Sequence, residues 1–128
     1  GTDRANYQAA FELLKQGRYK EASAALKQFM IAFPDSSLLD NAQYWLAETH
    51  YVSQSYDKAL PEFSVVVEKY PQSRKLPDAL LKIGYCNYEL KRFDAARKAL
   101  QTLVSNYPET DAARLAGQRL GRMTSEGL

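Results

Sequence analysis

Few side chains in this sequence could carry out catalysis or hold a metal ion. The 128 residues include one histidine, His50, and one cysteine, Cys86. A single Cys excludes an internal disulfide and a cysteine-based zinc site, and a single His excludes the metal motifs that need two. No glycine-rich phosphate loop, nucleotide-binding fingerprint or serine–histidine–aspartate motif occurs. We therefore predict that the chain is not an enzyme and has no cofactor and no metal site.

His50 and Cys86 have simpler structural interpretations. His50 has no second ligand at helical spacing, so we expect it to be packed or exposed. Cys86 has no nearby His to activate its thiol, so we interpret it as a small buried apolar residue.

Composition and charge exclude further classes of function. Hydrophobic residues make up 45% and charged residues 25% of the chain, which is typical of one globular domain. Basic residues outnumber acidic ones by 17 to 15 and never occur more than two in a row, so we expect no nucleic-acid partner. No run of about 18 apolar residues occurs, so we expect no insertion into a membrane. The chain begins without an initiator Met, and we interpret it as one domain of a longer protein.

The sequence repeats itself with a period of 37 residues. Equally spaced prolines end the matching segments Phe33-Pro34-Asp35-Ser36, Tyr70-Pro71-Gln72-Ser73 and Tyr107-Pro108-Glu109-Thr110. The same shift relates residues of one type in other columns: Ala22, Ala59 and Ala96; Tyr19, Tyr56 and Phe93; Leu26, Phe63 and Leu100; Ala10, Ala47, Gly84 and Gly121. This self-similarity predicts a repeat architecture.

Each unit contains two predicted helices, because its apolar residues recur at intervals of three and four. The first helices are expected at about 3–16, 39–54 and 77–91, and the second at about 19–33, 57–70 and 94–107. We interpret Asp57 and Asp94 as N-caps, and we expect Ser36, Ser73 and Thr110 to help cap the next helix. Pro61 conflicts with its helix, which should start late or bend slightly there.

No unit can bury its apolar face alone, so the units should stack into a solenoid. The small residues of the column that begins with Ala10 should let paired helices approach closely. A last helix, at about 111–123, repeats the first-helix pattern without a partner and should cap the stack. We therefore predict one domain over 1–123, with repeats at about 3–36, 39–73 and 77–110, and a frayed tail at 124–128.

These columns resemble the tetratricopeptide repeat over nearly the whole chain. The order of a small residue, Tyr or Phe, Ala, two large apolar residues and Pro matches that family. The period exceeds the usual length of about 34 residues by three, inserted between Pro and the next helix. The resemblance implies an all-α solenoid of three helix-turn-helix repeats with a C-terminal capping helix, whose first helices line a concave groove.

One face of each first helix is expected to point into this groove and bind a partner. Tyr side chains suit such a surface, because they bury a large area at small entropic cost. We expect Tyr51 and Tyr88 to contact the ligand, whereas burial and ligand contact are equally good interpretations of Tyr44 and Tyr85. Trp45 is interpreted as a core residue. The predicted partner-binding residues are Arg4, Tyr7, Phe11, Asn41, Tyr44, Glu48, Tyr51, Asp78, Leu81, Tyr85 and Tyr88, and Leu115, Gln118 and Arg122 continue the stripe.

The expected ligand is an internal segment of another protein, either helical or extended. Cytosolic repeats of this family often hold a terminal carboxylate with Lys and Asn, but the matching positions of the first unit are Tyr7 and Phe11. A carboxylate needs cationic or amide donors, which these residues lack.

Two segments carry a more specific resemblance. Asn41-Ala42-Gln43-Tyr44-Trp45-Leu46-Ala47-Glu48 and the ending from Tyr107 to Leu120 are similar to the periplasmic cell-division coordinators of the Tol-Pal system. This resemblance implies a non-enzymatic scaffold that associates with TolA and modulates a peptidoglycan synthase complex, linking outer-membrane constriction to septal peptidoglycan synthesis. It also implies that the parent protein is a homotrimer, held together by an N-terminal coiled coil that is absent here.

Two alternatives stay open. The lipoprotein subunit of the outer-membrane β-barrel assembly machine has similar repeat ends, but usually more repeats and a lipidated Cys. A cytosolic co-chaperone is disfavoured by the missing carboxylate-binding residues. The upstream sequence would separate the three, through a signal peptide with heptads, a lipidation motif, or neither.

Overall fold

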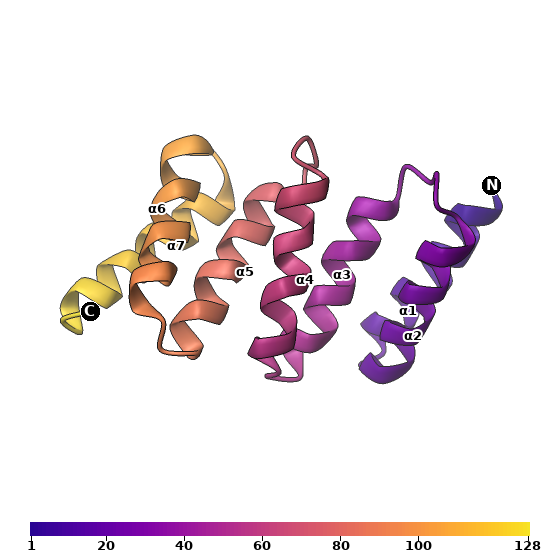
Figure 1. Cartoon of the computed structure of the whole chain (residues 1–128), viewed down its shortest axis with the longest axis horizontal. Coiled ribbons are helices and arrows are strands. Elements are labelled where there is room, and N and C mark those ends of the chain that lie inside the picture. The colour runs from indigo at the N-terminus through magenta and orange to yellow at the C-terminus, as the bar shows by residue number, and fades with distance from the viewer.

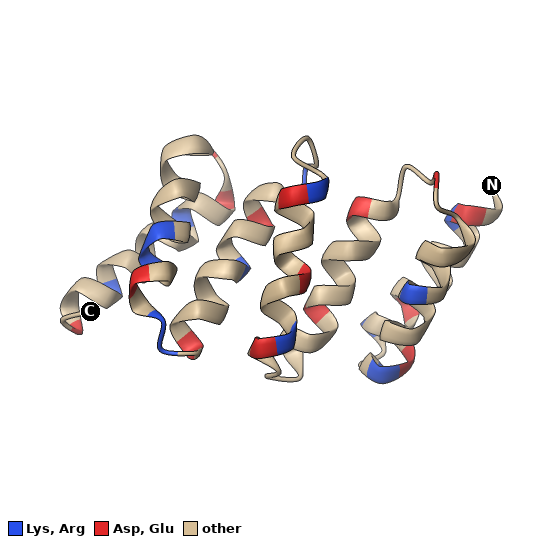
Figure 2. Ribbon diagram, in the orientation of Figure 1, with Lys and Arg blue, Asp and Glu red and all other residues tan.

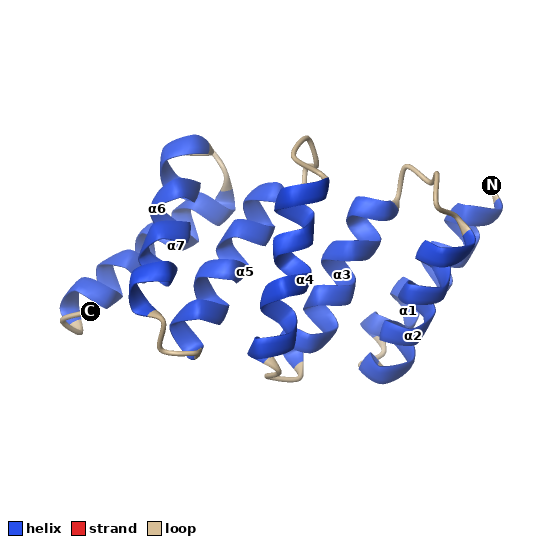
Figure 3. Cartoon of the chain, in the orientation of Figure 1, coloured by secondary structure: helices blue, strands red, loops and turns tan.

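The computed structural model describes all residues from 1 to 128. It contains seven α-helices and no β-strands (Figures 1 and 3). They follow one another along the long axis of the molecule, from the N-terminus at the right of Figure 1 to the C-terminus at the left. The predicted all-α fold is confirmed. The helices are α1 (Thr2–Lys15), α2 (Tyr19–Ala32), α3 (Leu39–Val52), α4 (Tyr56–Lys69), α5 (Leu76–Glu89), α6 (Phe93–Asn106) and α7 (Asp111–Ser125).

The helices form two layers. The first helices, α1, α3, α5 and α7, are drawn farther from the viewer in Figure 1 than the second helices, α2, α4 and α6. Each helix packs on the next one in the chain, and α7 also packs on α5. The repeated columns fill the core between the layers, where Leu26, Phe63 and Leu100 are fully buried. None of the helices combines the length and the apolar character that spanning a membrane requires.

A left-handed residue ends the first helix of each unit. The φ angle is 77° at Gly17, 61° at Gln54 and 63° at Lys91. The next residue donates its backbone N–H to the carbonyl five positions back, which in the last unit is the bond from Arg92 to Asn87 at 2.8 Å. This is the Schellman motif, which satisfies carbonyls that the helix end would leave unpaired.

The same motif orders the C-terminus and corrects the expectation of a frayed tail. The backbone is left-handed at Gly127, where φ is 77°, and Leu128 donates its N–H to the Met123 carbonyl at 2.8 Å. The Leu128 side chain packs against the cluster that α7 forms with α5 and α6. An apolar contact beyond the helix end commonly accompanies this motif, and it holds the last residues in place.

The helices α4 and α6 each begin one residue earlier than expected, while α2 begins at Tyr19 as expected. The N-caps of α4 and α6 are Ser55 and Arg92, so the interpretation of Asp57 and Asp94 as N-caps is wrong. Both carboxylates instead lie in the first turn, where the helix dipole favours negative charge. Pro61 causes no late start, because α4 begins at Tyr56 and continues past it.

Hydroxyl groups after the repeated prolines join the first helices of successive units. Ser36 Oγ donates to Asp3 Oδ2 at 2.8 Å, and Ser73 Oγ donates in the same way to Asp40 Oδ2. Each Oγ also accepts the backbone N–H of the residue directly before the next helix, Leu38 or Lys75. The third unit has Pro77 where a carboxylate would stand. Thr110 instead caps α7 by accepting the Ala113 N–H at 3.1 Å, which confirms its expected role.

Candidate partner-binding face

The predicted partner-binding residues differ in how much surface they offer. Arg4 is exposed, and eight others are half-buried. Tyr44 and Leu81 are only 6% and 4% exposed and belong to core clusters, which corrects the expectation that their side chains face a groove. The half-buried residues are Tyr7, Phe11, Asn41, Glu48, Tyr51, Asp78, Tyr85 and Tyr88.

Three pairs of side chains, each 34 residues apart, connect neighbouring first helices. The Phe11 and Trp45 rings meet edge to face at a centroid distance of 5.1 Å. Glu48 and Lys82 form an ion pair at 3.1 Å. The Arg119 guanidinium lies 4.2 Å from the Tyr85 ring centroid. Together these six residues form what we call the first-helix face, and its chemistry changes from aromatic at the N-terminal end to cationic at the C-terminal end.

The central ion pair is shielded from solvent. The Glu48 and Lys82 side chains are 16% and 19% exposed, so water screens their attraction less than at the surface. Lys82 Nζ also lies 4.1 Å from the centroid of the Tyr51 ring. Glu48 Oε1 accepts no hydrogen bond of good geometry, although Nζ is 3.1 Å away. The pair therefore fixes charge in the middle of the face while leaving one carboxylate oxygen without a hydrogen-bond donor.

Cations lie over most of the aromatic rings of the first helices. Lys75 Nζ is 4.5 Å from the Trp45 ring centroid, and the Arg119 guanidinium is 4.8 Å from that of Tyr88. An ammonium or guanidinium group is attracted to the negative face of an aromatic ring. The tyrosines therefore act partly as platforms that hold cations in place, and a ligand would meet N–H donors as well as ring surface.

The C-terminal end of the face contains a bound carboxylate of the chain itself. The Tyr88 hydroxyl donates to Glu126 Oε1 at 2.6 Å, and Arg122 Nε donates to Oε2 at 3.4 Å. The hydrogen bond from Tyr88 lowers the pKa of the Glu126 carboxyl, and the same bond raises the pKa of the Tyr88 hydroxyl. A hollow of about 200 Å³ lies beside this cluster, lined by Tyr85, Leu115, Gln118, Arg119 and Arg122.

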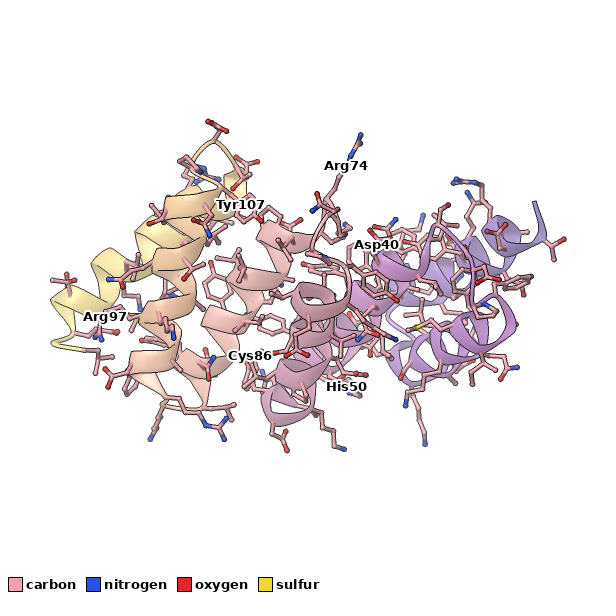
Figure 4. The ribbon with its side chains drawn as sticks, turned by 45° about the horizontal axis from the view of Figure 1, so that its top comes forward. Asp40, His50, Arg74, Cys86, Arg97 and Tyr107 are labelled. Atoms are coloured by element: carbon pink, nitrogen blue, oxygen red, sulfur yellow. The ribbon has the colours of Figure 1, made fainter.

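Neither His50 nor Cys86 takes part in these hydrogen bonds, ion pairs and ring contacts. Cys86 is fully buried between α4 and α5 (Figure 4), and burial raises the pKa of its thiol to about 12. The thiol is therefore protonated at neutral pH, which agrees with its interpretation as a small apolar residue. Burial lowers the pKa of the His50 imidazole. No group of three His, Cys, Asp or Glu residues could hold a metal ion.

Sequence reasoning missed the second member of each cross-helix pair. The core interpretation of Trp45 agrees with its packing against two core clusters but omits its contact with Phe11, and Lys82 and Arg119 are not among the predicted residues. The members of each pair are 34 residues apart, which is three fewer than the repeat period of 37. The second member therefore stands three positions earlier in its own unit than the first member does in the preceding unit, and this constant spacing is the signal in the sequence. Acidic and basic residues both occur along the whole row of helices (Figure 2).

Comparison with curated proteins finds a relative along a short segment. The cell division coordinator CpoB of Pseudomonas putida is 46% identical over 44 residues. The aligned segment covers 34% of this chain and 16% of the relative.

Solved structures share the fold at low sequence identity. The Sgt2 repeat domain from Aspergillus fumigatus has a TM-score of 0.79 and 14% identity, covering 99% of this chain and 82% of that domain. PcrH, solved in complex with the chaperone-binding region of PopB, has a TM-score of 0.76 and 16% identity. The match covers 95% of this chain and 94% of PcrH. MamA from Desulfovibrio magneticus has a TM-score of 0.71 and 18% identity, covering 96% and 74%.

Family models extend this likeness to the sequence. Two models described as tetratricopeptide repeat match residues 7–74 and 78–110. The first of these ranges alone covers more than half of the chain, and the seven helices have the arrangement that the family implies. The chain belongs to the tetratricopeptide repeat family, whose domains are scaffolds that bind proteins or peptides.

Proposed function

We propose that this chain is a protein-interaction domain of the bacterial periplasm that acts in cell division. Two observations support the setting: the segment 46% identical to a cell division coordinator, and the resemblance of the chain's ending to that family. The proposed partners are TolA and a peptidoglycan synthase complex. We further propose that the parent protein is a homotrimer joined by an N-terminal coiled coil.

The observation that carries the binding role is the first-helix face. Half-buried aromatic residues and cations from all four first helices lie there along one side of the molecule. Half-buried aromatic side chains are frequent anchors in protein interfaces, because a partner that covers them removes the rest of their surface from water. An internal segment of the partner, helical or extended, would lie across α1, α3, α5 and α7.

The experiment is a titration of the fluorescently labelled chain with the purified periplasmic region of TolA. We expect saturable binding that Tyr85→Ala weakens by about 1–2 kcal/mol. Tyr85 is suitable because its ring is half-buried and faces the hollow between α5 and α7, with the Arg119 guanidinium over it. Tyr19→Ala is the matched control, since Tyr19 is exposed on α2, away from the face. Wild-type affinity in the Tyr85 variant, with unchanged melting, would place the binding surface elsewhere.

A further inference from the structure

The hollow at the C-terminal end of the first-helix face has the composition of an anion site. It lies between α5 and α7, and two of its five lining residues are arginines, Arg119 and Arg122. Gln118 adds an amide, while Tyr85 and Leu115 form the apolar part of the lining. Its volume of about 200 Å³ suits one side chain of a partner rather than a whole segment.

Arg119 is held in position without using its hydrogen-bond donors. The guanidinium lies 4.2 Å from the Tyr85 centroid and 4.8 Å from the Tyr88 centroid, and it makes no ion pair and no hydrogen bond with the protein. Two aromatic platforms thus fix a half-buried cation beside an open hollow. A guanidinium has five N–H donors in a planar fork, which matches the two oxygens of a carboxylate.

Glu126 shows that this cluster binds a carboxylate. Its two oxygens accept from Tyr88 Oη at 2.6 Å and from Arg122 Nε at 3.4 Å. Because Glu126 follows α7 directly and its side chain is 37% exposed, a carboxylate from outside could replace it on Arg122.

We propose that the hollow is a subsite for an acidic side chain of the partner protein, bound by Arg119 and Arg122. In the free protein the Glu126 carboxylate pairs with Arg122, so it competes with the partner's carboxylate for that guanidinium. This subsite rests on the proposed function as a protein-binding domain, and it assigns an acidic residue to the part of the partner segment that crosses α5 and α7. Charge complementarity favours an acidic side chain in the hollow, because Arg119 has no carboxylate partner there whereas Arg122 is paired with Glu126.

The test is an NMR titration of the ¹⁵N-labelled chain with two blocked peptides, Ac-Leu-Glu-Glu-Leu-NH₂ and its Gln-Gln counterpart. We expect the acidic peptide alone to shift the α7 amides and the side-chain Nε–H signals of both arginines. Arg119→Gln should weaken this binding about fivefold, because it removes a charged donor. Glu126→Gln should strengthen it about twofold, because it removes the internal competitor. Equal binding of the two peptides, or unchanged binding in both variants, overturns the subsite.

The two proposals fail separately. If Arg119→Gln binds the TolA region as tightly as the wild type does, the subsite is wrong and the binding function stands. If TolA does not bind but the acidic peptide does, the partner is wrong and the subsite stands. Arg119 also packs on two rings, so melting curves must accompany the titrations, and Glu126→Gln supplies a variant with the opposite expected sign.

Discussion

Gly84 in α5 and Gly121 in α7 hold the same position of the repeat, but their surroundings differ. A Cβ atom added to Gly84 would lie 2.4 Å from Leu100 Cδ2 and 2.7 Å from Leu100 Cγ. A Cβ atom added to Gly121 would meet no atom within 4 Å. The close-packing role inferred for the whole column therefore holds at Gly84 and is wrong at Gly121, because α6 covers α5 there and no second helix covers α7. A repeated residue type marks a packing site only where the partner helix exists.

The largest expected effect is that of Gly84→Leu. Leu100 is fully buried, so it cannot swing away without disturbing the contact between α5 and α6. We expect the free energy of unfolding to fall by about 3 kcal/mol, at the upper end of typical overpacking costs. Urea denaturation followed by circular dichroism measures it. Gly121→Leu is the matched control and should not lower the midpoint, because nothing lies within 4 Å of the added Cβ atom and Leu is a better helix former than Gly; equal losses in both variants would contradict the difference between the two sites.

Thr110→Ala should have the next largest effect. Thr110 is the N-cap of α7, and its Oγ1 accepts the Ala113 N–H at 3.1 Å. Removing such a cap costs about 1 kcal/mol. Because α7 lacks the second helix that supports α3 and α5, the loss should concentrate there. Hydrogen exchange should show faster exchange of α7 amides than of α5 amides, whereas uniform acceleration in both helices would show that α7 is no weaker than α5.

Gly121→Ala should stabilise the protein. Glycine in a helix interior costs roughly 0.5–1 kcal/mol relative to alanine, because it loses more conformational freedom on folding. The free space around Gly121 means that no clash offsets this gain. Thermal melting should show a higher midpoint, while Gly84→Ala should lower it. A lower midpoint in both variants would mean that Gly121 has a packing partner after all.

The sequence predicted the helices better than it predicted the face. Repetition of apolar columns placed all seven helices, because apolar residues recur at helical intervals of three and four within every unit. The cross-helix pairs, such as Glu48 with Lys82, do not share a residue type between units, so no column revealed them. Tyr44 shows the opposite difficulty: its spacing fits the face, but its ring packs edge-on against Phe63 in the core.

Capping residues were hard to predict for a related reason. Asp57 and Asp94 are good N-caps by type, but the helices begin before them at Tyr56 and Phe93, whose partly buried rings pack against the core clusters. Tertiary packing thus determined where these helices start, and local preference did not. The tail was misjudged because Gly127 and Leu128 were not recognised as a Schellman motif.

The smallest expected effect compares His50 with its counterpart in the third unit, Asn87. Burial lowers the pKa of His50 from its ordinary value of 6.5 in the folded protein. Between the folded and unfolded pKa values the unfolded chain binds more protons, so stability falls as the pH drops below about 6.5 and levels off below the folded pKa. His50→Asn, which imports the residue of the third unit, should remove this part of the acid sensitivity. Urea midpoints at pH 7.5 and pH 5 measure it: the two midpoints should differ less in the variant than in the wild type, and an unchanged difference would show that His50 is as easily protonated folded as unfolded.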